Sequence, residues 1–125
     1  MTRFRSEDAF ASLDRQDWPE LAVKACRLAI RAAGVDDTTA LDALRALERR
    51  TVDAEAAASM CELADRFDQA AWDAQAASDY DVLFRRARAV SALAFALSEE
   101  PDEAIYEAAH AVGTPEDLVR QLGDE

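Results

Sequence analysis

Apolar residues recur at intervals of three and four positions along most of the chain, which is the spacing of one face of an α-helix. The clearest stripe consists of Trp18, Leu21, Ala25, Leu28 and Ala32. Gly34 can end this helix because glycine readily takes the left-handed conformation. Asp17, with Glu20 three residues later, is typical of a capping box at a helix start. The pattern therefore predicts a helix from Trp18 to Ala33.

Two longer segments, Val52 to Ala76 and Asp79 to Leu97, carry heptad-like apolar repeats. The first repeat consists of Ala57, Met60, Ala64, Phe67, Ala71 and Ala74, and the second of Leu83, Ala87, Val90, Ala94 and Leu97. The second segment is apolar on its other sides too, so neighbouring elements must surround it. We expect these two helices to pack together as the spine of the fold.

Shorter helices complete the predicted architecture. One is expected from Ser6 to Leu13, and another carries the Leu41, Leu44 and Leu47 face after an Asp36-Asp37 capping turn. Two more are expected from Pro101 to Gly113 and from Thr114 to near Leu122. Ser78 is expected to cap the second long helix. The connections are short, and no composition break marks a linker. The sequence therefore predicts an all-α protein, a compact antiparallel helical bundle of about six helices, two of them short, as a single domain over residues 1–125.

Composition agrees with this fold, and the charge distribution narrows the partners. Alanine is the commonest residue, and 125 residues are enough to bury a core without staples. Residues 1–50 carry nine basic and nine acidic side chains, whereas residues 51–125 carry five and 17. The second part thus holds the whole net charge of −12. Such a field repels nucleic acid and anionic membranes and attracts basic surfaces.

The sequence also favours a cytoplasmic location. Its start lacks the apolar core of a signal peptide, and its longest apolar stretch, Ala89 to Leu97, is too short to span a membrane. Cys26 and Cys61 occupy apolar mid-helix positions, so we expect both to be core thiols in a reducing compartment.

The residues with most chemical potential lie on the penultimate helix. Glu107 and His110 have the Glu-x-x-His spacing with which helical bundles hold metals, but His110 is the only histidine, whereas di-iron sites need the unit twice. A histidine in the last helical turn also favours the negative helix end without any further role. We therefore expect no metal and no cofactor, and we keep His110, Glu107 and Tyr106 as catalytic candidates only for an enzyme alternative.

Acidic residues dominate the polar face of the Val52–Ala76 helix. Glu62 and Asp65 have a Glu-x-x-Asp spacing known from magnesium sites, but the upstream Glu-x-x-Glu pair of such sites is missing. A solvated face is the simpler interpretation. The expected partner-binding residues are Glu55, Glu62, Asp65 and Asp73.

Two further clusters have structural interpretations. Arg85, Arg86 and Arg88 form the only basic cluster of the acidic part and are expected to pair within the molecule rather than to hold a phosphate. The aromatic side chains of Trp18, Trp72, Tyr80 and Tyr106 are expected to belong to the core rather than to line a ligand pocket.

Two functional hypotheses follow. The first is a protein- or peptide-binding helical module whose acidic surface binds, and in this way neutralises, a basic protein or peptide, as immunity proteins and antitoxins do; charge is the whole of that analogy. The second is a small helical enzyme or biosynthetic helper with a cleft near Glu107 and His110, between helices or at a dimer interface. The Ala-rich seams also predict a homodimer, because they offer more apolar surface than a small bundle covers.

Overall fold

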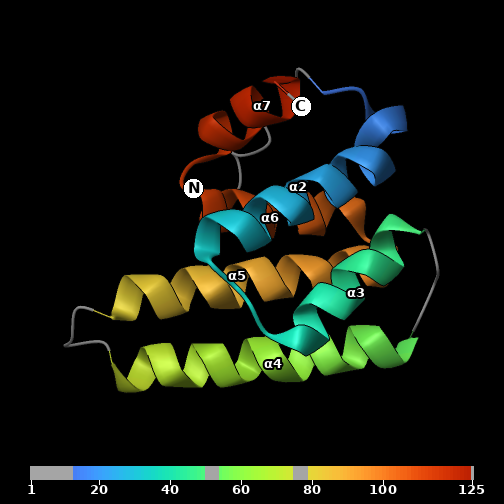
Figure 1. The fold of residues 1–125 in the computed structure, drawn as a ribbon. Helices are drawn as coiled ribbons and strands as arrows, with labels where there is room; N and C mark the ends of the chain where they lie inside the picture. The colour runs from blue at the N-terminus through green and yellow to red at the C-terminus, as the bar shows by residue number, and fades with distance from the viewer. Residues whose placement is uncertain (1–12, 50–53, 75–78, 125) are drawn as a thin grey trace.

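The computed structural model describes residues 13–49, 54–74 and 79–124 (Figure 1). All regular secondary structure in these residues is helical. The elements are the 3₁₀-helix η1 (Arg15–Asp17) and the α-helices α2 (Trp18–Ala33), α3 (Thr38–Glu48), α4 (Ala54–Asp73), α5 (Tyr80–Leu97), α6 (Pro101–Val112) and α7 (Pro115–Asp124). The predicted all-α bundle is confirmed. The predicted helix from Ser6 and the Ser78 cap lie outside the described residues.

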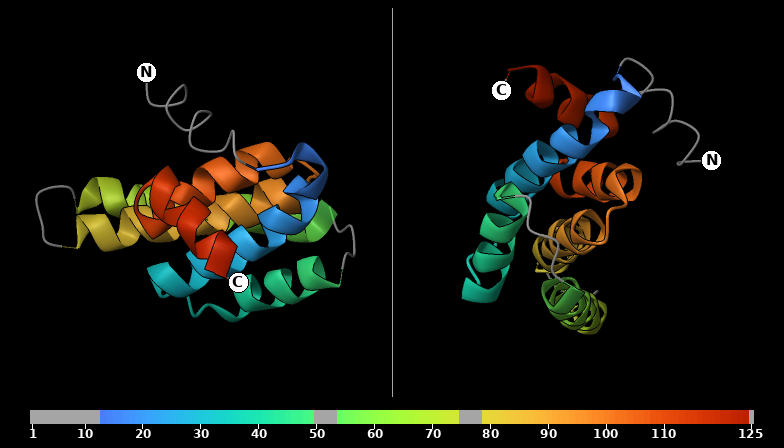
Figure 2. Two further views of the ribbon diagram at one scale, coloured as in Figure 1. Left: turned by 90° about the horizontal axis from the view of Figure 1, so that it is seen from above. Right: turned by 90° about the vertical axis from the view of Figure 1, so that its right-hand side faces the viewer.

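Consecutive helices α4, α5 and α6 run up and down beside one another (Figure 1). Seen end on, these three helices form a column, with α2 and α3 along one side of it and α7 across the top (Figure 2). Helix α5 packs against α4, α6, α2 and α3. The Asp79–Leu97 segment is thus the central helix, as its apolar pattern predicts.

Alanine allows the helices around α5 to approach closely. The buried residues of α5 are Ala87, Ala89, Val90, Ala92, Leu93, Ala94 and Leu97. Facing helix α4 buries Ala57, Met60, Leu63, Ala64 and Ala71, whereas Phe67 is half-buried. The α4–α5 contact is the most extensive between any two described elements, which confirms the predicted spine.

Most of both heptad-like seams is buried within a single chain, whereas Phe67, Ala74 and Leu83 are half-buried. The expected homodimer stays a prediction, although most of the seam surface on which it rested is covered within one chain. No helix in the described parts of the chain has the length and apolarity needed to cross a membrane.

The start of α2 differs in detail from the sequence expectation. The Asp17 side chain makes no capping hydrogen bond, because Asp17 lies in the preceding 3₁₀-helix and has helical backbone angles (φ −90°, ψ −8°). A side-chain cap needs an extended residue at this position. Asp14 is extended, and its Oδ1 accepts a hydrogen bond from the Gln16 amide at 3.0 Å. The cap thus serves η1 rather than α2.

Helices α2 and α5 end in the same hydrogen-bonded motif with different residues at its critical position. After α2, the amides of Gly34 and Val35 donate to the carbonyls of Arg31 and Ile30. After α5, the amides of Glu99 and Glu100 donate in the same way to Ala96 and Phe95. This Schellman motif needs a left-handed residue, which is Gly34 (φ 68°) in one case and Glu99 (φ 61°) in the other. The second site is strained because a side chain disfavours this conformation.

Candidate functional site

The four predicted partner-binding residues lie along the solvent-facing side of α4. Glu55, Glu62, Asp65 and Asp73 are all exposed. Glu55 and Asp73 are 18 residues apart, so the side chains are spread over about 27 Å of helix. Helix α4 buries its other side against the core, and Arg66 is its only basic residue. We call these four residues the acidic face.

Asp73 has a local polar partner, since Gln69 Nε2 donates to its Oδ1 at 3.2 Å one turn earlier. This neutral donor leaves the charge of Asp73 uncompensated. The four carboxylates of the acidic face are exposed along the helix, which also carries the exposed Arg66 one turn after Glu62.

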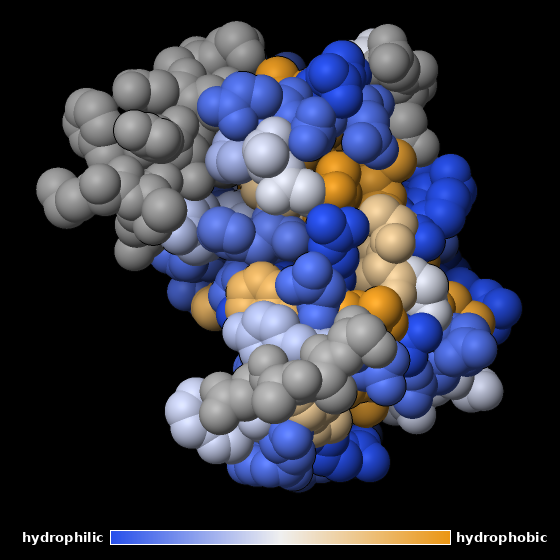
Figure 3. Space-filling model, turned by 90° about the vertical axis from the view of Figure 1, so that its left-hand side faces the viewer, coloured by the Kyte–Doolittle hydropathy of each residue, from blue (hydrophilic) through white to orange (hydrophobic). Residues whose placement is uncertain are grey.

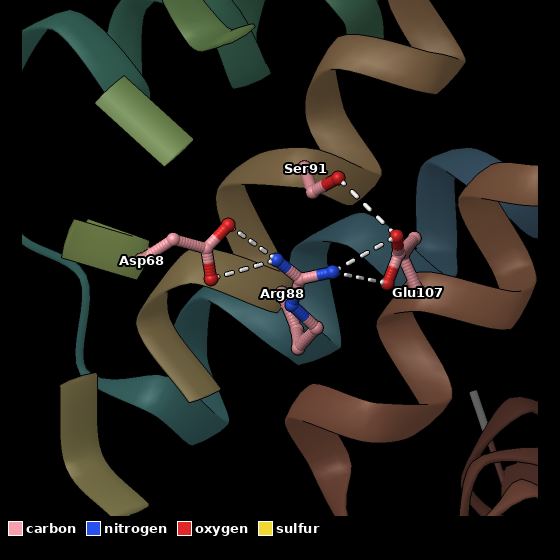
Figure 4. A network of polar contacts seen from close by, with 4 residues as sticks. All are labelled: Asp68, Arg88, Ser91 and Glu107. Atoms are coloured by element: carbon pink, nitrogen blue, oxygen red, sulfur yellow. Dashed lines mark hydrogen bonds and ion pairs between the residues drawn. The ribbon is translucent and has the colours of Figure 1, made fainter. Parts of the chain in front are cut away.

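A half-buried ionic network lies beside the acidic face (Figure 4). The sequence predicted that Arg88 pairs within the molecule, but not which partners it takes. Arg88 of α5 reaches Asp68 of α4 on one side and Glu107 of α6 on the other. Its Nη2 lies 2.9 and 2.7 Å from the two carboxylate oxygens of Asp68, and its Nη1 lies 3.1 Å from both oxygens of Glu107. Ser91 Oγ also donates to Glu107 at 3.4 Å. One guanidinium group thus ties together the three helices of the column.

The network carries a net charge of −1, because one guanidinium faces two carboxylates. The side chains of Arg88 and Glu107 are 20% and 14% exposed, whereas that of Asp68 is 44% exposed. The Arg88 guanidinium also lies over the Phe84 ring, 5.5 Å from its centroid, while its Nε is buried without a hydrogen-bond partner. The remaining negative charge is therefore closest to solvent at Asp68, next to the acidic face.

A shallow cavity of about 210 Å³ adjoins the network between α4 and α5. Its lining residues are Cys61, Ala64, Asp65, Asp68, Ser91, Ala94, Phe95, Ser98 and Glu100. Three of these are carboxylates and none is basic. The cavity therefore extends the negative surface of α4 inward toward α5.

The three catalytic candidates of the enzyme alternative are only partly brought together. The Tyr106 and His110 rings make an edge-to-face contact with their centroids 4.8 Å apart. Glu107 instead binds Arg88, so its carboxylate is already bound within the molecule. In the part of the chain that the structure describes, no group of three or more His, Cys, Asp or Glu side chains is placed to hold a metal ion.

The basic cluster pairs within the molecule through two of its three members. Arg88 forms the network, and Arg86 Nε donates to the Ala33 carbonyl at 3.3 Å, at the negative end of α2. Arg85 is exposed. The signal that could have singled out Arg88 was its place between Ala87 and Ala89, which are both buried in α5.

The two cysteines have different environments, so the prediction of two core thiols is only half right. Cys26 is free and fully buried, and burial raises the pKa of its thiol from 9.0 to about 12. Cys61 is free but exposed. Cys61 lies at the edge of the buried stripe of α4, where it lines the cavity between α4 and α5.

The expectation that the aromatic residues belong to the core fails for Trp72, whose exposed fraction is 66%. Tyr80 is also exposed and stacks on Phe84 with 6.0 Å between ring centroids. Trp18 and Tyr106 are half-buried. The aromatic surface where α4 ends and α5 begins was therefore not predicted from the sequence.

Comparisons with protein-family models, with curated proteins and with solved structures find no match to this chain.

Proposed function

We propose that this protein is a binding module for a basic protein or peptide and that the acidic face of α4 is its docking surface. The observation that carries the proposal is the exposure of all four carboxylates on the open side of a helix whose other side is packed on the core. The net charge of −1 in the neighbouring Arg88 network and the acidic cavity beside it add to the same field.

Electrostatics supports this class of partner. A row of carboxylates repels phosphate backbones and anionic lipid headgroups, so nucleic acid and membrane surfaces are disfavoured. Lysine- and arginine-rich surfaces are attracted over a distance of about 8 Å at physiological ionic strength. Such attraction acts mainly on the association rate and falls steeply with salt. A protein of this kind would hold a basic partner and mask its charge.

The test uses a defined probe, a peptide of about 18 alternating lysine and serine residues, which as a helix matches the length of the acidic face. We call it the Lys–Ser peptide. Glu62→Lys combined with Asp65→Lys should weaken its binding about tenfold and flatten the salt dependence of the dissociation constant. Both residues are exposed, so the variant should keep its helical circular dichroism spectrum.

The matched control reverses two exposed carboxylates elsewhere. Asp17→Lys with Glu116→Lys makes the same change in net charge at the starts of α2 and α7. Equal weakening by both double variants would mean that the peptide responds to total charge alone and would overturn the docking surface. Absence of binding to the wild type at low salt would overturn the proposed function.

The enzyme alternative is left as an outcome of the same experiments. Glu107 is bound by Arg88, and no observation brings the Glu107, His110 and Tyr106 side chains together at one cavity. A ligand whose affinity ignores salt and the α4 reversals but collapses with His110→Ala would favour the enzyme.

A cytoplasmic location and a dimeric state remain predictions. Two free cysteines are compatible with a reducing compartment. Sedimentation equilibrium measures the oligomeric state directly, and a monomer would refute the predicted homodimer.

A further inference from the structure

The exposed large apolar side chains of the described residues gather at one end of the molecule. They are Trp72 (66% exposed), Val82 (45%) and Tyr80 (37%). Trp72 lies in the last turn of α4 and the other two lie in the first turn of α5. Because α4 and α5 are antiparallel neighbours, these turns share an end of the bundle (Figures 1 and 2). We call the three residues the apolar tip.

Carboxylates frame the apolar tip. Asp73 follows Trp72 directly, and Asp79 and Asp81 flank Tyr80; all three carboxylates are exposed. Figure 3 looks onto this end of the molecule, where hydrophilic surface surrounds scattered hydrophobic areas. Exposed indole and phenol rings surrounded by charge are typical of the residues that anchor protein interfaces.

The apolar tip is continuous with the acidic face. Trp72 follows Asp65 by seven residues, which places both on the same side of α4. A partner lying along the acidic face would therefore reach Trp72 at its end. Long-range attraction by the carboxylates and short-range burial at the rings can then act on a single ligand.

We propose that the apolar tip anchors the basic partner, which must carry leucine-like apolar side chains on the same helical face as its lysines or arginines. This inference rests on the proposed function and specifies the chemistry of the partner. Charge excludes the other occupants. A second copy would bring Asp73, Asp79 and Asp81 against their own equivalents across a two-fold axis, and an anionic membrane would meet the same repulsion.

The molecule already contains this recognition chemistry in its own fold. Arg88 places its guanidinium over the Phe84 ring while it binds the Asp68 carboxylate, and Tyr80 stacks on the same ring. A cation is thus held jointly by an aromatic face and an aspartate. Trp72 and Asp73 bring an aromatic ring and a carboxylate to the same turn of α4, with the indole as the stronger ring for a cation.

The experiment compares two peptides of equal charge. One is the Lys–Ser peptide. The other, the Lys–Leu peptide, has leucine in place of only those serines that fall on one face of the helix. Isothermal titration calorimetry should find that the wild type binds the Lys–Leu peptide at least about tenfold more tightly. Trp72→Ala should abolish most of this difference, with a much smaller loss of Lys–Ser binding, whereas Trp72→Phe should retain it.

Val82→Ser is a second, independent variant at the apolar tip and should reduce the preference for the Lys–Leu peptide in the same direction. Both residues are exposed, so circular dichroism melting curves should match the wild type. If the wild type binds the two peptides equally, or if Trp72→Ala keeps the preference, the apolar tip does not anchor the partner. Neither result contradicts the acidic face as the docking surface. If Trp72→Ala instead converts a dimer into a monomer in sedimentation equilibrium, the apolar tip belongs to a second copy and the inference is overturned.

Discussion

Replacing Arg88 by methionine should destabilise the fold by about 3 kcal/mol, because it leaves the Glu107 carboxylate inside the bundle without its cation. Methionine keeps most of the aliphatic volume of arginine, so the change removes the guanidinium and little packing. The wild-type guanidinium reaches both carboxylates at 2.7–3.1 Å, from α5 to α4 and α6.

The magnitude follows from how exposed each partner is. Asp68 is 44% exposed and can be hydrated after the substitution, so the loss of its ion pair should lower the free energy of unfolding by at most about 1 kcal/mol. Glu107 is 14% exposed and would keep only the long hydrogen bond from Ser91. Its uncompensated charge should therefore lower the free energy of unfolding by about 2–3 kcal/mol. Loss of the Phe84 contact adds about 0.5–1 kcal/mol. Removal of the buried, unpartnered Nε raises the free energy of unfolding by about the same amount, so the two effects offset each other.

Urea unfolding followed by far-ultraviolet circular dichroism measures the effect, with two further variants. Arg88→Met combined with Glu107→Met should be more stable than Arg88→Met alone, because the second change removes the stranded charge. Arg45→Met breaks an Asp42 pair whose side chains are 65% and 64% exposed, and it should cost less than about 0.5 kcal/mol.

Two results would refute this reasoning. One is an Arg88→Met variant as stable as the Arg45→Met control, which would mean that water screens the network as it screens a surface pair. The other is a double variant whose loss equals the sum of the two single losses, since independent sites add and coupled sites do not.

Two further predictions concern backbone strain and thiol chemistry. Glu99→Gly should raise the free energy of unfolding by about 0.5–1 kcal/mol by relieving the left-handed strain after α5, and Gly34→Ala should lower it by about 1 kcal/mol; a loss with Glu99→Gly would contradict the motif. In the native protein a thiol reagent should modify Cys61 quickly and Cys26 only on unfolding. Burial raises the pKa of the Cys26 thiol to about 12, so the native state holds the thiol proton more tightly than the unfolded state does. The resulting stabilisation is complete below the ordinary pKa of 9.0, and above it the free energy of unfolding falls by about 1.4 kcal/mol per pH unit. Cys26→Ala should remove this dependence in urea titrations at rising pH.

Local signals in the sequence were enough to place several helices. The bounds of α2 were predicted from its stripe and Gly34, and those of α6 from Pro101 and Gly113. These signals work because a glycine or proline changes the backbone conformations open to its own residue, whatever the rest of the chain does. The central place of α5 was also predicted, since a helix that is apolar on all sides has to be surrounded.

The acidic face was located from the sequence for the same reason. Helical spacing fixes which residues of α4 share a side, and the charges of Glu55, Glu62, Asp65 and Asp73 could be assigned to the side opposite the apolar stripe. Whether they bind a partner stays a prediction.

Only the tertiary structure decided what covers each side of a helix. Cys61 and Trp72 lie on α4 next to apolar residues, yet both are exposed, because Cys61 borders the cavity between α4 and α5 and Trp72 lies in the last turn of α4. Asp68, Arg88 and Glu107 are separated by 20 and 19 residues, and no local pattern connects them. Sequence periodicity determines the faces of each helix by itself, whereas burial and ionic pairing depend on which helices become neighbours, and that choice is made by the packing of the whole bundle.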